Sequence, residues 1–126
     1  MSLSQIQGLG NDLIEIGRVK EAHSEHKQAF LDRLFTKKEQ EYCFSQKDPY
    51  PRFAGRFAAK EAIAKAFGCG FGSEISWHDI EILADEKGKP EVHISGKLEE
   101  QFNHPKILVT ISHCKEYASA VALWIE

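Results

Sequence analysis

The feature that most constrains this chain is an alanine-rich segment from Arg52 to Phe67, which stops at Gly68. Alanine is the strongest helix former, and glycine commonly ends a helix because it adopts the left-handed conformation at little steric cost. At about 100° per residue, one stripe of this helix carries four apolar side chains. These are Phe53, Phe57, Ala64 and Phe67. The segment therefore predicts one long helix that buries this stripe, followed by a break in the glycine-rich run 68–72.

The segments on either side predict helices before this long helix and mainly strands after it. Before it we expect a strand at 6–16 broken by two glycines, a helix at 18–34, and a helix from 36 to before 48. After it we expect strands at 78–84, 92–94, 107–112 and 119–125, with a short helix at 97–102. Helices first and hairpin strands later favour an α+β fold, with an antiparallel-rich sheet packed against helices, over a parallel Rossmann-type sheet.

Local signals set several of these boundaries. The run Thr36 to Glu39 fits a capping box at a helix start, and Pro49 and Pro51 mark a turn after that helix. The run 85–90 is a turn that joins two strands into a hairpin. In the helix at 18–34, apolar residues recur at helical spacing. The positions expected to be buried there are Val19, Ala22, Ala29, Phe30 and Leu34.

The length of 126 residues favours a single domain over residues 1–126, with no room for a second independent core. With 42% hydrophobic and 28% charged residues, the composition is that of a folded globular protein, not of a disordered one. A net charge of −3 argues against a generally basic nucleic-acid binder, although a local basic patch is compatible with it. The longest charge-free stretches are much shorter than a membrane span.

The cysteines and the N-terminus predict where the protein works. Cys43, Cys69 and Cys114 have neither metal-site nor redox spacing, which is typical of free thiols in a reducing cytosol. The first residues contain neither a basic region nor an apolar run, so no secretory signal is visible. We therefore expect a cytoplasmic protein.

Two carboxylates stand in apolar surroundings. Glu61 follows Phe57 by one helical turn and lies on the flank of the apolar stripe, with Lys65 one turn further on. Asp12 interrupts a mostly apolar strand, where aspartate is uncommon. Together Asp12 and Glu61 could hold Mg²⁺, which binds hard oxygens through one or two carboxylates plus substrate phosphates. Two plainer interpretations are open at this point: a Glu61–Lys65 ion pair on the helix surface, and Asp12 as a turn cap.

A third candidate is the strand end at 110–113. There Ser112 and His113 place a hydroxyl and an imidazole where they could contact a phosphate or move a proton. The plainer interpretation is an exposed histidine with no role. The sequence contains no nucleophile elbow, no Walker loop and no zinc-ligand spacing, so those classes of enzyme are excluded.

Taken in order, four segments resemble the holo-acyl carrier protein synthases, the small bacterial class of the 4′-phosphopantetheinyl transferases. They cover nearly the whole chain at the spacing of that family: Gly8 to Arg18, Arg52 to Gly68, Asp85 to Pro90, and Ile111 to His113 with Lys115 to Ala118. Four ordered segments together are far more specific than any one of them. The resemblance therefore favours metal ligation over the plainer interpretations of Asp12 and Glu61.

The resemblance implies a reaction. The enzyme would transfer the phosphopantetheine arm of coenzyme A to a serine of apo-acyl carrier protein and release 3′,5′-ADP, in support of fatty acid biosynthesis. It would need Mg²⁺, held by Asp12 and Glu61, with Lys65 on a phosphate. Because the attacking serine belongs to the carrier protein, the lack of a catalytic nucleophile here is expected. Either a water or a carboxylate could take the serine proton, and the sequence leaves both open.

The resemblance also implies where the partners bind. Ser112 and His113 would lie near the phosphates of coenzyme A, and the turn Gly88-Lys89-Pro90 beside its adenosine end. Arg18 would face the carrier protein. The family is typically trimeric, with active sites between neighbouring subunits. A homotrimer would suit a chain too short to enclose so long a ligand alone.

Two departures qualify this interpretation. Carrier proteins of this kind are acidic, and the region 16–38 carries six positive and three negative residues, but Glu21 and Glu25 lie among the cations. The docking residues beyond Arg18 therefore stay undefined. Cys69 and Cys114 also differ from the residues expected there. Two alternative functions remain: a metal-dependent phosphohydrolase acting on coenzyme A-like substrates, and a non-catalytic module that binds a carrier protein.

Overall fold

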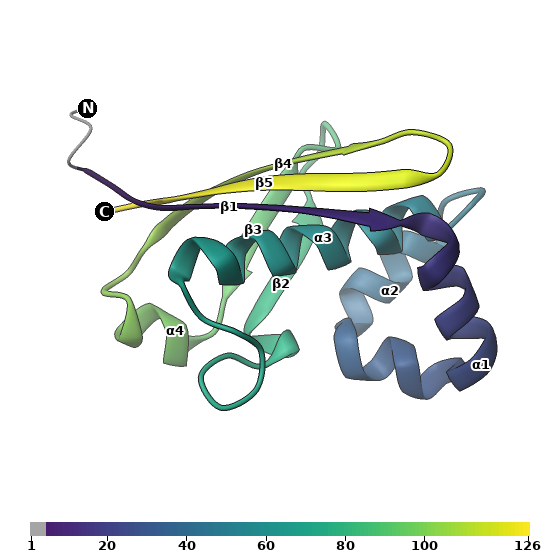
Figure 1. Cartoon of the computed structure of the whole chain (residues 1–126), viewed down its shortest axis with the longest axis horizontal. Coiled ribbons are helices and arrows are strands. Elements are labelled where there is room, and N and C mark those ends of the chain that lie inside the picture. The colour runs from purple at the N-terminus through teal and green to yellow at the C-terminus, as the bar shows by residue number, and fades with distance from the viewer. Residues whose placement is uncertain (1–4) are drawn as a thin grey trace.

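Helix α3 (Tyr50–Phe67) lies along one face of a three-stranded sheet and is the central element of the fold (Figure 1). The computed structural model describes residues 5–126. The other helices are α1 (Ile16–Leu34), α2 (Lys37–Phe44) and α4 (Gly96–Gln101), with a short 3₁₀ helix η2 (Trp77–Asp79). The strands are β1 (Ile6–Glu15), β2 (Ile80–Ala84), β3 (Pro90–Ile94), β4 (Lys106–His113) and β5 (Tyr117–Ile125).

All strand pairs in the described residues are antiparallel. The three-stranded sheet has the order β1-β5-β4, and β2 with β3 forms a separate hairpin whose turn is the one predicted at 85–90. In Figure 1, α3 runs beneath the sheet, with α1 and α2 near one end and α4 near the other. The predicted α+β fold with an antiparallel sheet packed against helices is confirmed.

The ends of α3 show why this segment forms the longest uninterrupted helix. Pro49 is its N-cap residue and Pro51 lies in its first turn, where a missing N–H leaves no intrahelical bond unmade. The predicted turn between the two helices is present at 45–49, but it ends at Pro49, and Pro51 already belongs to the helix. At the other end, Gly68 caps the helix in the left-handed conformation with φ 75°, as predicted. The alanines of α3 pack into the core below the sheet: Ala58, Ala59, Ala62, Ala64 and Ala66.

Helix α1 is bent, which changes its buried face. Lys27 has a non-helical backbone with φ 55° and ψ −140°, so the helical phase restarts after it. The predicted burial of Val19 and Leu34 is confirmed, and Ala22 and Phe30 are half-buried. The prediction for Ala29 is wrong: it is exposed, and Leu31 is fully buried instead. A continuous helical repeat places the buried face correctly only up to the bend.

The two glycines of β1 let this strand touch α3 directly. A side chain at Gly8 would overlap the carbonyl oxygen of Ala66, and one at Gly10 would overlap the carbonyl oxygen of Ala62. The strand also has a register irregularity between Ile6 and Gly8. The sequence predicted a close approach or a bulge at these glycines. Both are present, and the close approach fixes the position of the rest of β1 over the helix.

Three other expectations concern the surroundings of the protein. Within residues 5–126, no helix is long and apolar enough to cross a membrane. The expectation that the chain lacks a secretory signal depends partly on residues 1–4, which lie outside the described residues. Cys43, Cys69 and Cys114 are free thiols, as expected.

Candidate active site

A cleft of about 660 Å³ opens between β1, α1 and α3. Three sequence predictions meet in it, because Asp12, Glu61 and Lys65 all line the cleft. Its charged rim also includes Glu15 and Arg18. Apolar side chains line the rest of the cleft: Ile14, Val19, Phe30 and Phe57. The cleft therefore combines a compact set of charges with an apolar surface of the kind that accommodates an organic ligand.

Asp12 owes its place to the alternation of β1. Side chains two residues apart on a strand share a face, so Asp12 points to the same side as Gly10, toward α3. Asp12 lies in the middle of the strand opposite Ala120 of β5, and its side chain is only 16% exposed. The interpretation of Asp12 as a turn cap is therefore wrong. A carboxylate held inside the sheet above the helix can act only on what enters the cleft.

Lys65 binds β1 across the cleft. Its Nζ donates to the backbone oxygen of Asn11 at 2.9 Å and to Oδ1 of Asp12 at 3.2 Å. The structure shows no ion pair between Lys65 and Glu61, so the interpretation of these two as a local surface pair is wrong. Lys65 remains 53% exposed, which leaves its ammonium group accessible to a ligand.

Glu61 is half-buried and lines the same cleft as Asp12. Burial raises its pKa, the negative charge of Asp12 raises it further, and the positive charge of Lys65 opposes both. Because the charge of Asp12 acts on Glu61, the two carboxylates repel one another unless a cation lies between them. Residues 5–126 contain no cluster of three or more histidine, cysteine, aspartate or glutamate side chains arranged to hold a metal ion. A cation at Asp12 and Glu61 would thus have two protein ligands, a donor set that fits Mg²⁺ with substrate phosphates and water.

Arg18 lies at the rim of the cleft, in the first turns of α1. Its Nε is 3.3 Å from Oε1 of Glu15, and its side chain is largely exposed. An exposed pair of this kind contributes little to stability. Arg18 is therefore available for contact with a partner that approaches the cleft.

The other predicted residues lie elsewhere in the chain. His113 ends β4, on the edge of the sheet opposite β1, and its Nε2 is 2.7 Å from Nη1 of Arg52. Together with Ser112 it borders a smaller hollow beside Leu13 and Tyr117. The plainer interpretation of His113 holds only in part, since the imidazole is exposed but hydrogen-bonded.

The predicted adenosine turn forms a third surface. Lys89 lies in a hollow along the β2–β3 turn, with Gly88 at the tip and Pro90 at the start of β3. No residue of this turn lines the cleft of Asp12. A single chain therefore brings together the carboxylates, Lys65 and Arg18, but not Ser112, His113 or the turn 88–90, which were also predicted to contact coenzyme A.

Two features around the cleft were not predicted. One is a stack of aromatic rings, in which Phe71 lies 3.7 Å from Trp77 and Trp77 lies 5.3 Å from Phe57, measured between ring centroids. The other is an ion pair between Lys60 and Glu39, both fully buried. A lysine surrounded by alanines on the buried part of a helix was the available signal, because a buried lysine requires a partner.

The fold and the cleft first define a general class: a small α+β protein whose two carboxylates and lysine suit a divalent cation and phosphate groups. A family model described as the 4′-phosphopantetheinyl transferase superfamily matches residues 8–122. The chain belongs to this superfamily, as the sequence predicted.

Individual relatives agree with this placement. A holo-[acyl-carrier-protein] synthase of Protochlamydia amoebophila is 54% identical over 117 residues, which is 93% of this chain and 96% of that protein. Among solved structures, the synthase of Helicobacter pylori in complex with coenzyme A is 33% identical, with a TM-score of 0.85, covering 92% of this chain and 98% of that one. The synthase of Bacillus anthracis in complex with CoA (3′,5′-ADP) is 35% identical, with a TM-score of 0.82, covering 95% and 96%.

Proposed function

We propose that this chain transfers the 4′-phosphopantetheine arm of coenzyme A to a serine of an apo-acyl carrier protein and releases 3′,5′-ADP. The observation that carries the proposal is the meeting of Asp12, Glu61 and Lys65 in one cleft of a chain that belongs to this superfamily. Two similar structures are complexes with coenzyme A, which supports coenzyme A as the substrate. We place the reaction in the cytoplasm, in support of fatty acid biosynthesis.

The reaction exchanges one phosphorus–oxygen bond for another. The serine oxygen of the carrier attacks the phosphorus that bears the pantetheine arm, the bond from that phosphorus to the bridging oxygen breaks, and 3′,5′-ADP leaves with the electron pair. Such a transfer depends mainly on positioning and on neutralising phosphate charge. Lys65 supplies a positive charge within reach of a phosphate in the cleft.

The carboxylates would hold Mg²⁺ in this reaction. Asp12 and Glu61 present hard oxygen ligands, and a bound divalent cation would supply charge neutralisation at the diphosphate. A bound cation would relieve the repulsion between the two carboxylates, which favours cation binding at this site. The serine proton would leave through a water or a carboxylate of the cleft.

A homotrimer would complete the site. Apart from Lys65, the residues expected to contact coenzyme A do not line the cleft of their own chain, so a neighbouring copy would bring its Ser112, His113 and turn 88–90 to it. The outer face of the sheet could carry the contact, because large apolar side chains on it are exposed. They include Leu9 at 66%, Leu13 at 65%, Leu108 at 45% and Val121 at 42%. Exposed apolar patches of this kind commonly mark interfaces.

The oligomeric state can be measured directly. Light scattering should give a mass near three chains, and Leu108→Asp, on the outer face of the sheet, should lower both that mass and the transfer rate. Ala29→Asp, at an exposed apolar position on α1, is the matched control for the mass, which it should leave unchanged. A fully active monomer would contradict the shared site.

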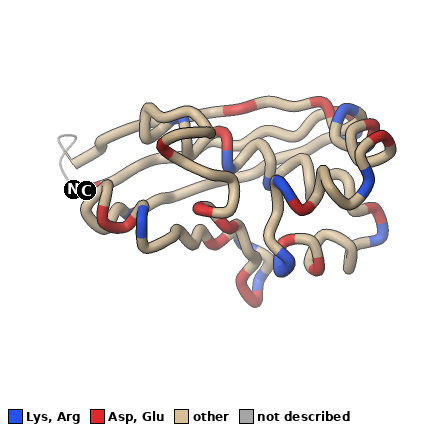
Figure 2. The backbone as a smooth tube through the Cα atoms, turned by 90° about the horizontal axis from the view of Figure 1, so that it is seen from below, with Lys and Arg blue, Asp and Glu red and all other residues tan. Residues whose placement is uncertain are grey.

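The carrier protein would dock beside Arg18. Figure 2 shows basic and acidic stretches interleaved along the chain, with no single basic face in that view. At the cleft itself, Arg18 is the exposed cation that would meet an acidic carrier. Replacing Arg18 by alanine should raise the KM for the carrier while leaving the KM for coenzyme A nearly unchanged.

A set of incubations, complete and with one component left out at a time, distinguishes the proposed function from its alternatives. Apo-carrier protein, coenzyme A and Mg²⁺ are mixed with the chain, and the carrier is weighed by intact-mass spectrometry while the nucleotide products are separated. Transfer adds the phosphopantetheine arm to the carrier. A phosphohydrolase would instead cleave coenzyme A without any carrier present, and a docking module would bind the carrier without Mg²⁺ or coenzyme A. No mass gain beside an active reference enzyme would overturn the proposal.

A further inference from the structure

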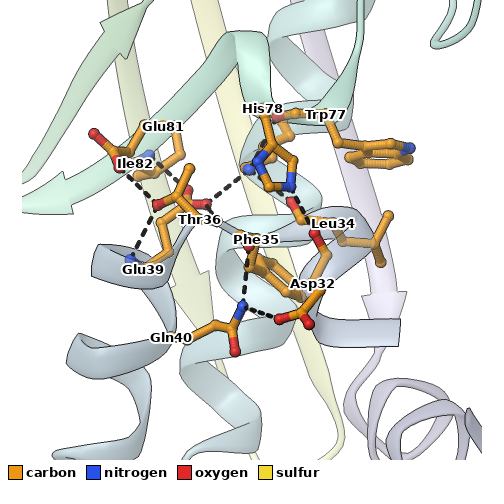
Figure 3. Close-up of polar contacts among 11 residues, drawn as sticks. Asp32, Leu34, Phe35, Thr36, Glu39, Gln40, Trp77, His78, Glu81 and Ile82 are labelled. Atoms are coloured by element: carbon orange, nitrogen blue, oxygen red, sulfur yellow. Dashed lines mark hydrogen bonds and ion pairs between the residues drawn. The ribbon is translucent and has the colours of Figure 1, made fainter. Parts of the chain in front are cut away.

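A buried ion pair joins α3 to the elements around it. Nζ of Lys60 lies 2.8 Å from Oε1 of Glu39 in α2, and both side chains are 0% exposed. The pair lies where α2, α3 and β2 meet, as Figure 3 shows around Glu39. No residue of the pair lines the cleft.

Every hydrogen-bonding group of this pair is used. Lys60 has three donors, which bind the carbonyl oxygen of Leu34 at 2.7 Å, Glu39, and the carbonyl oxygen of Trp77 at 3.1 Å. Glu39 also accepts from the backbone N–H of Thr36 at 2.8 Å and of Ile82 at 2.7 Å. One pair therefore connects the end of α1, the start of α2, α3, η2 and β2.

Two routes lead from the pair to the cleft. The first is along α3, because Lys60 directly precedes Glu61, and holding Lys60 fixes the rotation of the helix about its axis. The second passes through η2, because Trp77, whose carbonyl Lys60 binds, stacks on the Phe57 ring with the ring planes 24° apart. Phe57 forms part of the apolar wall. Both a carboxylate and a wall of the cleft are thus set by the same ammonium group.

Stability alone does not account for the pair. A buried ion pair is costly to desolvate, and apolar residues of similar volume often stabilise a protein equally well or better. Apolar residues cannot reproduce five directional hydrogen bonds that fix one arrangement of five segments. Some residues orient metal ligands without touching the metal themselves. Replacing such a residue commonly lowers metal affinity or activity 10- to 100-fold.

We propose that Lys60 and Glu39 are positioning residues. They fix the rotation of α3 about its axis, which directs Glu61 into the cleft. They also fix the position of Trp77, which holds the Phe57 ring in the wall of the cleft. This inference rests on the proposed function of the cleft. It assigns the pair no contact with substrate or metal.

The test compares three variants with the wild-type chain: Lys60→Met, Glu39→Gln and the double variant. The double variant leaves no unpaired charge buried, so it should regain much of the melting temperature that Lys60→Met loses. It does not restore the bonds to Leu34 and Trp77, so positioning should stay lost. Leu98→Ala, a fully buried core variant in α4, serves as the control for lost stability without lost positioning.

Two readouts are taken at a temperature where every variant is folded. The first is Mn²⁺ binding in the presence of coenzyme A and without carrier, followed by electron paramagnetic resonance; the second is the transfer rate. We expect the double variant to bind Mn²⁺ about tenfold more weakly or worse and to transfer at least tenfold more slowly. Leu98→Ala should match the wild type in both.

Three outcomes decide between the interpretations. If the double variant recovers Mn²⁺ affinity and transfer rate together with melting temperature, the pair has only a structural role. Equal losses in Leu98→Ala would show the same. If Lys60→Met does not fold, Glu39→Gln and the double variant still decide. A wild-type chain that transfers nothing overturns the proposed function instead, while the Mn²⁺ comparison continues to test the pair.

Discussion

Gly10 of β1 lies directly against the carbonyl oxygen of Ala62 in α3, with no space for a side chain between them. This contact brings the two carboxylates together. Asp12 lies two residues further along the strand on the same face, and Glu61 immediately precedes Ala62 on the helix. The geometry of the cleft therefore depends on a backbone contact that only glycine permits.

Replacing Gly10 by alanine should damage both fold and activity. The new methyl group would force β1 away from α3, at a cost of about 1–3 kcal/mol in the free energy of unfolding, and would move Asp12 relative to Glu61. Urea denaturation and the transfer assay measure the two effects. Gly96→Ala is the control, because nothing lies within 4 Å of a side chain added at Gly96. Wild-type behaviour of Gly10→Ala would show that the contact is unimportant.

Replacing Lys65 by alanine should cost activity but little stability. Its ion pair with Asp12 is partly exposed, and such pairs contribute about 0–1 kcal/mol. We expect turnover to fall about 100-fold or more, as when a group that stabilises developing charge is removed. Lys97 offers a close match, with a 3.2 Å pair to Asp79 and almost the same exposure, away from the cleft. Lys97→Ala should lose as little stability as Lys65→Ala and should keep full turnover. Equal turnover in the two variants would show that Lys65 has no part in the mechanism.

Glu61 should make stability depend on pH in a predictable direction. Its pKa in the folded chain is raised above the ordinary value of 4.5, so the folded state holds its proton more tightly than the unfolded state. The stability that this gives is complete below that value and is lost as pH rises through the folded-state pKa. Between about pH 4 and pH 8, without divalent cations, the wild type should therefore lose unfolding free energy relative to Glu61→Gln.

Added Mg²⁺ checks the same prediction from the other side. At about pH 8 it should stabilise the wild type more than Glu61→Gln, because only the wild type presents both carboxylates. Urea denaturation at several pH values, with and without Mg²⁺, measures both effects. A constant difference between the two proteins across pH would contradict the coupling between Glu61 and Asp12.

The three thiols should react in a fixed order. Backbone hydrogen bonds from Glu116 and Tyr117 lower the pKa of exposed Cys114, so it should be alkylated first. Burial, together with the Glu74 carboxylate, raises the pKa of Cys69 to about 11, and burial raises that of Cys43 to about 12. Intact-mass analysis during iodoacetamide treatment should show Cys114 labelled early and Cys43 only after unfolding. Early labelling of Cys43 would indicate that its part of the core opens readily.

Local signals predicted much of this fold. The capping box at Thr36 and Glu39 forms as expected, with both of its hydrogen bonds, because its partners are three residues apart. Gly68 ends α3 because glycine adopts the left-handed backbone conformation at little steric cost. Asp12 could be singled out because an acidic residue is rare within an apolar strand.

What escaped prediction depends on distant partners or on a local distortion. Lys60 and Glu39 are 21 positions apart and meet only once α2 packs on α3. His113 finds Arg52 across 61 positions, which no spacing rule anticipates. The predicted burial of Ala29 was wrong because the bend at Lys27 shifts the helical repeat. No glycine or proline near Lys27 indicates this bend in the sequence.

The most direct measurement is the intact mass of an apo-acyl carrier protein after incubation with coenzyme A and Mg²⁺, using wild type, Asp12→Ala and Glu61→Ala side by side. We expect the wild type to add the phosphopantetheine arm, and both folded variants to do so slower by about 100-fold or more. Removing Mg²⁺ with a chelator should stop the wild type as well. Transfer at the wild-type rate by either variant, or no transfer by the wild type, would contradict the assignment of this cleft.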